Sequence, residues 1–214
     1  MKLLIEAPTW VGDAVMSTPA IQNIINIYNL PEITLIGSLS SSKLFENNTN
    51  ISNICVLDRK NLNIYRFAKS LGKFDVFISF RGSLRSKLLK FFIVSKKKYQ
   101  FDKNKYKNFH QVEKYNNFVN ESLNIKSNAG SLKLYSKDIK NNNSAKLSVG
   151  INPGASYGDA KQWSPERFAE VAVALSSNYE IIIFGGPDEK KISKVIENFL
   201  IKNGVINFKN LTGI

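Results

Sequence analysis

The sequence predicts an α/β protein with parallel, doubly wound sheets, and two observations carry this prediction. Short apolar runs typical of buried strands alternate with longer runs in which apolar residues recur at helical spacing. Such alternation favours parallel strands joined by crossover helices. A polar segment without periodicity, residues 136–144, interrupts the alternation and predicts a linker between two units.

Strands and helices alternate from the first residues up to this linker. The expected strands lie at residues 2–7, 33–36, 51–57 and 75–80, and further candidates at 99–101 and 132–135. The expected helices lie at residues 14–28, 62–71, 84–92 and 110–123. We therefore predict a complete N-terminal Rossmann-like domain over residues 1–140.

The same pattern begins again after the linker. Ser164 followed by Pro165 is typical of the N-cap and first position of a helix. Apolar residues at i, i+3, i+4 and i+7 from Phe168 give this helix one buried face. Strands are expected at residues 147–152, 180–184 and 205–208, with another helix opening after 185–189. This is about two strand–helix pairs, so we predict an incomplete second Rossmann-like domain over residues 145–214.

The composition argues against several classes of protein. A chain of 214 residues with 43% hydrophobic residues can bury a core. No run approaches the roughly 18 apolar residues of a membrane span, and Glu6 and Pro8 interrupt the first apolar run where a signal peptide would continue. The single cysteine, Cys55, excludes an internal disulfide and argues against a cysteine-based metal site. We expect a cytoplasmic globular protein.

The net charge of +13 is concentrated in the middle of the chain. Residues 61–140 hold 18 Lys and Arg against 5 Asp and Glu, whereas residues 1–60 hold 4 against 5 and residues 141–214 hold 8 against 7. A confined excess indicates one anionic partner: an acidic glycolipid, an anionic membrane leaflet or nucleic acid. Aromatics interleave with lysines over residues 96–107, but they form no recognised nucleic-acid module, so we expect no nucleic-acid partner.

A glycine-containing turn follows the strand at 147–152 and has the layout of a phosphate-binding loop. Small residues at Gly154, Ala155 and Ser156 let backbone N–H groups approach an anion, and Lys161 adds a positive charge. An ordinary loop with a solvated lysine is the alternative. The turn is therefore a candidate donor-phosphate site.

A second candidate follows the first strand, where Asp13 stands beside Gly12. Ligands of open α/β sheets collect at the carboxyl ends of the strands, so Asp13 is a candidate general base. A helix cap or a dipole partner is the alternative reading of Asp13. Thr9, Trp10 and Gly12 precede Asp13 directly and are candidate acceptor contacts.

Other charged residues also follow expected strands. Glu189 comes after residues 180–184 and can accept hydrogen bonds from ribose hydroxyls, or act as an acid at a helix N-terminus.

Arg81, Arg85 and Lys87 come after residues 75–80. They suit the phosphates and carboxylates of an acidic sugar-lipid, or form a solvated helix face. The only histidine, His110, opens a helix and fits a capping or packing role better than a catalytic one.

Two motifs together carry a family resemblance. Trp10-Val11-Gly12-Asp13 and the segment from Pro153 to Trp163, which includes Ala160-Lys161-Gln162-Trp163, resemble the ADP-heptose:lipopolysaccharide heptosyltransferases of glycosyltransferase family 9. The resemblance implies an inverting GT-B enzyme that needs neither metal nor cofactor. It implies ADP-heptose as donor and the lipid A inner-core glycolipid as acceptor, at the cytoplasmic face of the inner membrane. It assigns Asp13 as general base and Lys161, with Ala155 and Ser156, to the donor phosphates.

One departure concerns the end of the chain. The family's second domain continues to an Asp-Ser-Gly loop that helps to bind the donor pyrophosphate, whereas this sequence ends at Ile214. We expect a C-terminally shortened enzyme, with a C-terminal fragment as a further partner. The alternative is a truncated non-catalytic form, or half of a split enzyme, that binds anionic glycolipid without turnover.

Overall fold

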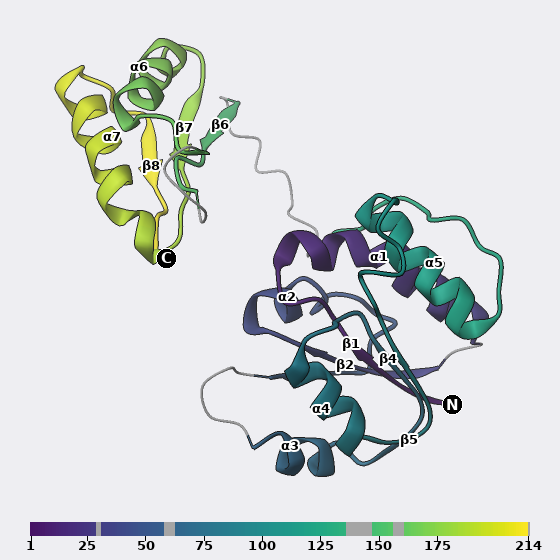
Figure 1. Cartoon of the computed structure of the whole chain (residues 1–214). Helices are drawn as coiled ribbons and strands as arrows, with labels where there is room; N and C mark the ends of the chain where they lie inside the picture. Colours follow the sequence, from purple (N-terminus) through teal and green to yellow (C-terminus); the bar gives the residue numbers. More distant parts are fainter. Residues whose placement is uncertain (29–30, 58–62, 136–146, 156–160, 214) are drawn as a thin grey trace. The chain divides into compact units, whose positions relative to one another are not determined.

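The computed structural model describes residues 1–28, 31–57, 63–135, 147–155 and 161–213, and it confirms the α/β class (Figure 1). The chain divides into two compact units, residues 1–138 and 139–214. The predicted linker at 136–144 lies outside the described residues.

The first unit contains a five-stranded parallel sheet in the order β3-β2-β1-β4-β5. Its strands are β1 (Lys2–Glu6), β2 (Glu32–Gly37), β3 (Asn53–Val56), β4 (Lys73–Ser79) and β5 (Val94–Gln100). The candidate strand at 99–101 is thus the end of the longer strand β5. The strand expected at 132–135 was wrong: the Lys133 N–H donates to the Thr18 hydroxyl at 3.0 Å instead of pairing with a strand.

Helices cover both faces of this sheet (Figure 1). On one side are α1 (Val11–Ile27) and α5 (Gln111–Leu123); on the other are α3 (Ile64–Ser70) and α4 (Leu84–Phe92). Successive β1 side chains point to opposite faces, so Leu3 and Ile5 join the core under α1 and α5, whereas Leu4 joins the core under α3 and α4. A short helix, α2 (Leu39–Lys43), was not expected from the sequence.

The second unit contains a three-stranded parallel sheet in the order β6-β7-β8. Its elements are β6 (Ser148–Ile151), α6 (Pro165–Ser176), β7 (Glu180–Ile183), the 3-10 turn η2 (Pro187–Glu189), α7 (Lys190–Lys202) and β8 (Phe208–Asn210). The Ser164 hydroxyl caps α6 as expected. The strand expected at 205–208 begins only at Phe208, because Gly204 at φ +72° and the bond from Val205 N–H to Leu200 O close α7 first.

Candidate functional site

The loops after β1, β4 and β5 meet at one edge of the first sheet, because parallel strands present their carboxyl ends together. A cavity of about 690 Å³ lies at this edge. Its wall includes Asp13 from α1, Lys87 and Lys90 from α4, and Gln111 and Tyr115 from α5. The structure therefore brings together two residues that the sequence singled out, Asp13 and Lys87.

Asp13 lies in the first turn of α1 and is partly buried. Burial raises the pKa of its carboxyl group. Burial and the nearby charge of Asp13 both raise the pKa of the Tyr115 hydroxyl, which lies on the same cavity wall. A raised pKa makes Asp13 a stronger base than an exposed aspartate. Its place in the first turn also suits the helix dipole, so that reading remains compatible with the geometry.

Arg81 does not line this cavity wall; it pairs with a buried carboxylate. Its guanidinium lies 3.3 Å from Oε1 of Glu6, the last residue of β1, and the Arg81 side chain is only 15% exposed. The Ser79 hydroxyl donates to Glu6 Oε2 at 2.6 Å, and the Ser86 hydroxyl donates to the same oxygen. Burial raises the pKa of Glu6, while the charge of Arg81 opposes that shift.

Glu6 was missed as a site residue in the sequence, although a carboxylate that ends an otherwise apolar strand was a visible signal. Its partners fix the loop after β4, because the Gln100 amide donates to the Arg81 carbonyl at 3.1 Å and to the Ser86 hydroxyl at 3.1 Å. Arg85 also acts on Glu6, whose pKa its charge lowers. Of the three predicted cations, Lys87 lines the cavity, whereas Arg81 and Arg85 act on Glu6.

The residues just before Asp13 have separate surroundings. The Ser38 hydroxyl donates to the Thr9 carbonyl at 2.8 Å, which ties the loop after β1 to the start of α2. Trp10 is 56% exposed, and a Cβ placed on Gly12 would meet no atom within 4 Å. The backbone at Gly12 is therefore open to a ligand, although Thr9, Trp10 and Gly12 are not part of the cavity wall.

In the second unit, Glu189 lies over the turn after β6. A Cβ placed on Gly154 would overlap Glu189 Cγ and lie 2.8 Å from its Oε1, and one placed on Gly186 would lie 3.0 Å from Glu189 Oε2. A Cβ placed on Gly185 would lie 2.8 Å from Glu189 Cβ. The glycines therefore make room for this carboxylate, and the structure brings together the predicted donor residues Gly154 and Glu189.

The rest of the predicted phosphate loop is only partly described. Ala155 is half-buried directly after Gly154, and Lys161 is exposed where the chain leads into α6. Ser156 lies outside the described residues. The exposure of Lys161 is compatible with both readings: a side chain that binds phosphate, or a lysine that only contacts solvent.

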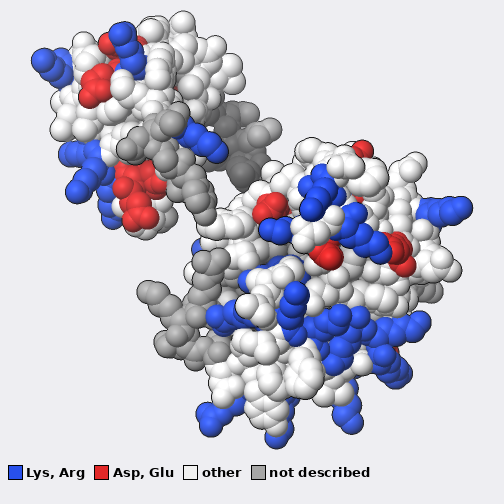
Figure 2. All heavy atoms as spheres, viewed as in Figure 1, with Lys and Arg blue, Asp and Glu red and all other residues white. Residues whose placement is uncertain are grey.

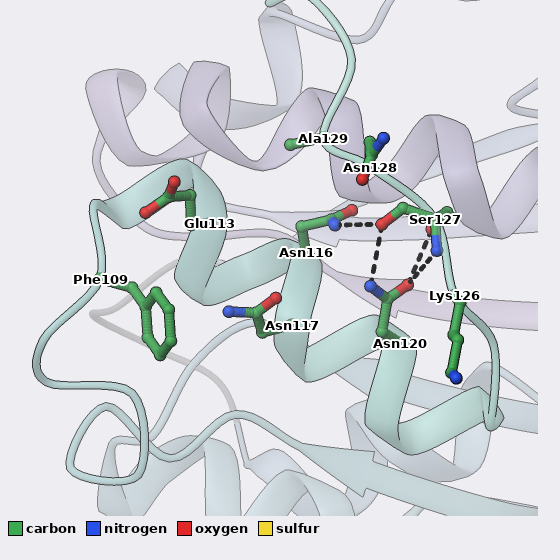
Figure 3. A pocket seen from close by; sticks show the side chains of 9 residues that line it. All are labelled: Phe109, Glu113, Asn116, Asn117, Asn120, Lys126, Ser127, Asn128 and Ala129. Carbon is green, nitrogen blue, oxygen red and sulfur yellow. Dashed lines mark hydrogen bonds between the residues drawn. The ribbon is translucent and has the colours of Figure 1, made fainter.

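Figure 3 shows a different hollow, of about 550 Å³, beside α5. Two of its amide groups are occupied within the fold: Asn116 and Asn120 both donate to the Ser127 carbonyl, at 2.7 Å and 2.9 Å. The Ser127 hydroxyl donates in turn to Asn120 Oδ1 at 2.7 Å. This hollow contains none of the residues predicted from the sequence, and its hydrogen bonds hold the loop that follows α5.

Metal ligands, membrane-spanning helices and the cap of α5 were also considered in the sequence. Among the described residues, no cluster of three or more His, Cys, Asp or Glu could hold a metal, and no helix is long and apolar enough to cross a membrane. That the enzyme needs no metal stays a prediction. His110 caps α5, with its Nδ1 accepting from the Val112 N–H at 3.4 Å, so the expected capping role is confirmed.

Two parallel α/β units, each with polar side chains at the carboxyl edge of its sheet, match the fold of GT-B glycosyltransferases. The family model of glycosyltransferase family 9 (heptosyltransferase) matches residues 64–207. Since this match and a 39% identical relative cover most of the chain, the chain belongs to glycosyltransferase family 9.

Relatives support the family at both sequence and fold level. Lipooligosaccharide heptosyltransferase 2 of Campylobacter jejuni serotype O:2 is 39% identical over 99% of this chain and 68% of its own length. The structure of E. coli ADP-heptose lps heptosyltransferase II matches with a TM-score of 0.83 and 18% identity over 100% of this chain and 73% of its own. E. coli heptosyltransferase WaaC with ADP matches with a TM-score of 0.78 and 16% identity, over 100% and 76%.

Proposed function

We propose that this chain transfers L-glycero-D-manno-heptose from ADP-heptose to the inner core of lipopolysaccharide. Relatives at 39% and 40% identity carry the name lipooligosaccharide heptosyltransferase 2. The observation that carries the proposal is the cavity at the carboxyl edge of the first sheet, which joins a partly buried carboxylate, Asp13, to a cation, Lys87. A base and an anion-binding group are what transfer to an acidic sugar-lipid needs.

Asp13 is the general base in this proposal. The acceptor hydroxyl oxygen bonds to the anomeric carbon from the face opposite the leaving group, while the bond from that carbon to the donor diphosphate breaks. The hydroxyl proton passes to Asp13, and the electron pair leaves with ADP. The raised pKa of Asp13 supports this role, since a stronger base removes the proton more readily. Lys87 and Lys90 attract the anionic groups of the acceptor.

The donor is held in this proposal by the second unit. Lys161 pairs with the diphosphate, backbone N–H groups of Gly154, Ala155 and Ser156 approach the same phosphates, and Glu189 accepts from ribose hydroxyls. The close contact of Glu189 with Gly154 supports a single donor site made by both. No metal or cofactor takes part. We further propose that the enzyme works on the cytoplasmic face of the inner membrane, where it meets its lipid-linked acceptor, and that nucleic acid is no partner.

The test separates donor binding from turnover. ADP affinity is measured by calorimetry, and ADP release is followed with ADP-heptose and a truncated lipopolysaccharide acceptor. Because the chain spans 68% of its curated relatives, both assays are run with the chain alone and with an added fragment that matches the relatives' remaining length. We expect acceptor-dependent ADP release from the chain alone or from the chain with the added fragment. This release should be lost in Asp13→Asn. Glycolipid binding without ADP release, both with and without the added fragment, would favour the non-catalytic alternative instead.

A further inference from the structure

The helix α4 exposes a stripe of large apolar side chains. Leu84 is 80% exposed, Leu88 50% and Phe91 75%, and their spacing of i, i+4 and i+7 places them on one face. The opposite face is buried, since Leu89 lies in the core under α3 and α4. A surface helix normally turns polar residues to solvent, so an apolar outward face indicates a contact surface.

Positive charges surround this apolar stripe. Lys87 lies on the same helix face, and Lys98 of β5 donates to the Phe91 carbonyl at 3.3 Å, so Lys98 lies beside the end of α4. Residues 64–107 hold 13 Lys and Arg against two acids, Asp75 and Asp102. Figure 2 shows Lys and Arg side chains gathered on this face of the first unit. Within the described part of the chain, neither Lys87 nor Lys98 forms an ion pair.

Edge protection explains only part of this arrangement. Strand β5 lies at the edge of the sheet, where lysines oppose pairing with another strand. That role does not account for the apolar side chains on α4. Apolar residues on a helix flanked by lysines are typical of helices that lie in a membrane interface.

We propose that the outward face of α4 docks on an anionic lipid bilayer. Leu84, Leu88 and Phe91 enter the boundary between headgroups and acyl chains, and Lys87 and Lys98 lie close to the lipid phosphates. A second copy of the chain fits this surface less well. A symmetric dimer would bring the same lysines of both copies together, and like charges repel.

Docking through α4 would also place the cavity next to the bilayer surface. Lys87 and Lys90 of this helix line the cavity that contains Asp13. A sugar that projects from the bilayer would therefore meet Asp13 while its lipid stays in the membrane. This consequence rests on the proposed function, but the docking itself does not.

Sugar-free vesicles test the docking independently of catalysis. Sedimentation with phosphatidylglycerol-rich vesicles is compared for the wild type, Leu88→Gln/Phe91→Gln and Leu39→Gln. The double variant should bind roughly 10- to 100-fold more weakly, because two apolar side chains no longer leave water. Leu39, which is 63% exposed on α2 of the same unit, is the matched control and should leave binding unchanged.

A second variant tests the charges. Lys98→Gln should weaken binding about fivefold at physiological salt, and the difference should shrink as added salt screens the charge. Vesicles of phosphatidylcholine alone should bind less of the wild type than anionic ones.

Three outcomes would overturn the proposal: no vesicle binding by the wild type, equal binding by Leu88→Gln/Phe91→Gln, or a wild-type dimer that this variant dissociates without any loss of vesicle binding. ADP affinity and transfer to a short soluble acceptor, measured on the same variant, should match the wild type. Failure of docking would leave these two readouts intact, whereas failure of the proposed function would remove transfer in the wild type as well.

Discussion

The Arg81 guanidinium lies 3.3 Å from Oε1 of Glu6, a carboxyl group buried at the end of β1. Oε1 accepts no hydrogen bond among the described residues, so the ion pair with Arg81 is its main compensation. Removing one partner of a buried pair leaves an uncompensated charge. Loss of either partner alone should therefore be costly at the carboxyl edge where the cavity lies.

Glu6 should make the stability of the protein depend on pH. Burial raises its pKa above the ordinary value of 4.5, so the folded state binds this proton more tightly than the unfolded state. The resulting stabilisation is fully present below the unfolded pKa and is lost as pH rises through the folded pKa. Urea unfolding of the wild type and Glu6→Gln from about pH 4 to pH 8 should show the free energy of unfolding of the wild type falling relative to the variant. Arg81→Met should extend this fall to higher pH. A constant difference would contradict the shift.

Asp13→Asn should lower turnover by about 10² to 10⁴-fold and leave ADP affinity nearly unchanged, because only proton removal from the acceptor is lost. Burial raises the pKa of Asp13, so wild-type kcat/KM should fall on the acid side at a pH above the ordinary aspartate value of 3.8. Steady-state rates over pH measure both effects. Asp75→Asn, in which the partly buried partner of Lys96 is replaced, is the control. Near-normal turnover in Asp13→Asn would remove this residue from the mechanism.

Lys161→Ala should weaken ADP binding roughly 10- to 100-fold and change acceptor binding less, because a charged hydrogen bond to the diphosphate contributes about 1.5–3 kcal/mol. Calorimetry with ADP measures the effect. Lys202→Ala removes another exposed lysine of the same unit, at the end of α7, and should have no effect. If the two variants bind ADP alike, Lys161 is only a solvated loop residue.

Gly154→Ala should act through Glu189. The added methyl group would overlap Glu189 Cγ and lie 2.8 Å from Oε1, so the whole Glu189 side chain must move away while the backbone stays in place. We expect Gly154→Ala and Glu189→Ala to weaken ADP binding to a similar extent, and the double variant to be no worse than either single variant, since coupled sites are not additive. Additive losses would show that Gly154 contributes independently of Glu189.

Sequence periodicity was sufficient for most elements of the fold, because buried strands and amphipathic helices leave regular apolar patterns. It failed where local bonding decided the structure. Residues 132–135 read as a strand, yet the N–H of Lys133 bonds to a side chain of α1. The helix α2 is too short to show a period; its start depends on the Ser38 cap, whose hydroxyl accepts from the Ser41 N–H.

The candidate site was predictable in part for a similar reason. Parallel topology alone places Asp13 and Lys87 at one sheet edge, so position along the chain was enough to group them. Arg81 could not be assigned that way, because its pairing with Glu6 depends on which side chains are buried between β1 and β4. The contact of Glu189 with Gly154 likewise depends on the exact path of two loops.

The amide network beside α5 bears on the conditions under which the cavity keeps its shape. Asn23 of α1 donates to Asn116 of α5 at 2.8 Å and to the Asn128 carbonyl at 3.0 Å, which links the helices that carry Asp13 and Tyr115. Amides carry no ionisable proton and no net charge, so neither acid nor added salt weakens these links as it weakens ion pairs. The spacing of Asp13 and Tyr115 should therefore persist in strong electrolyte that abolishes attraction to anionic lipid.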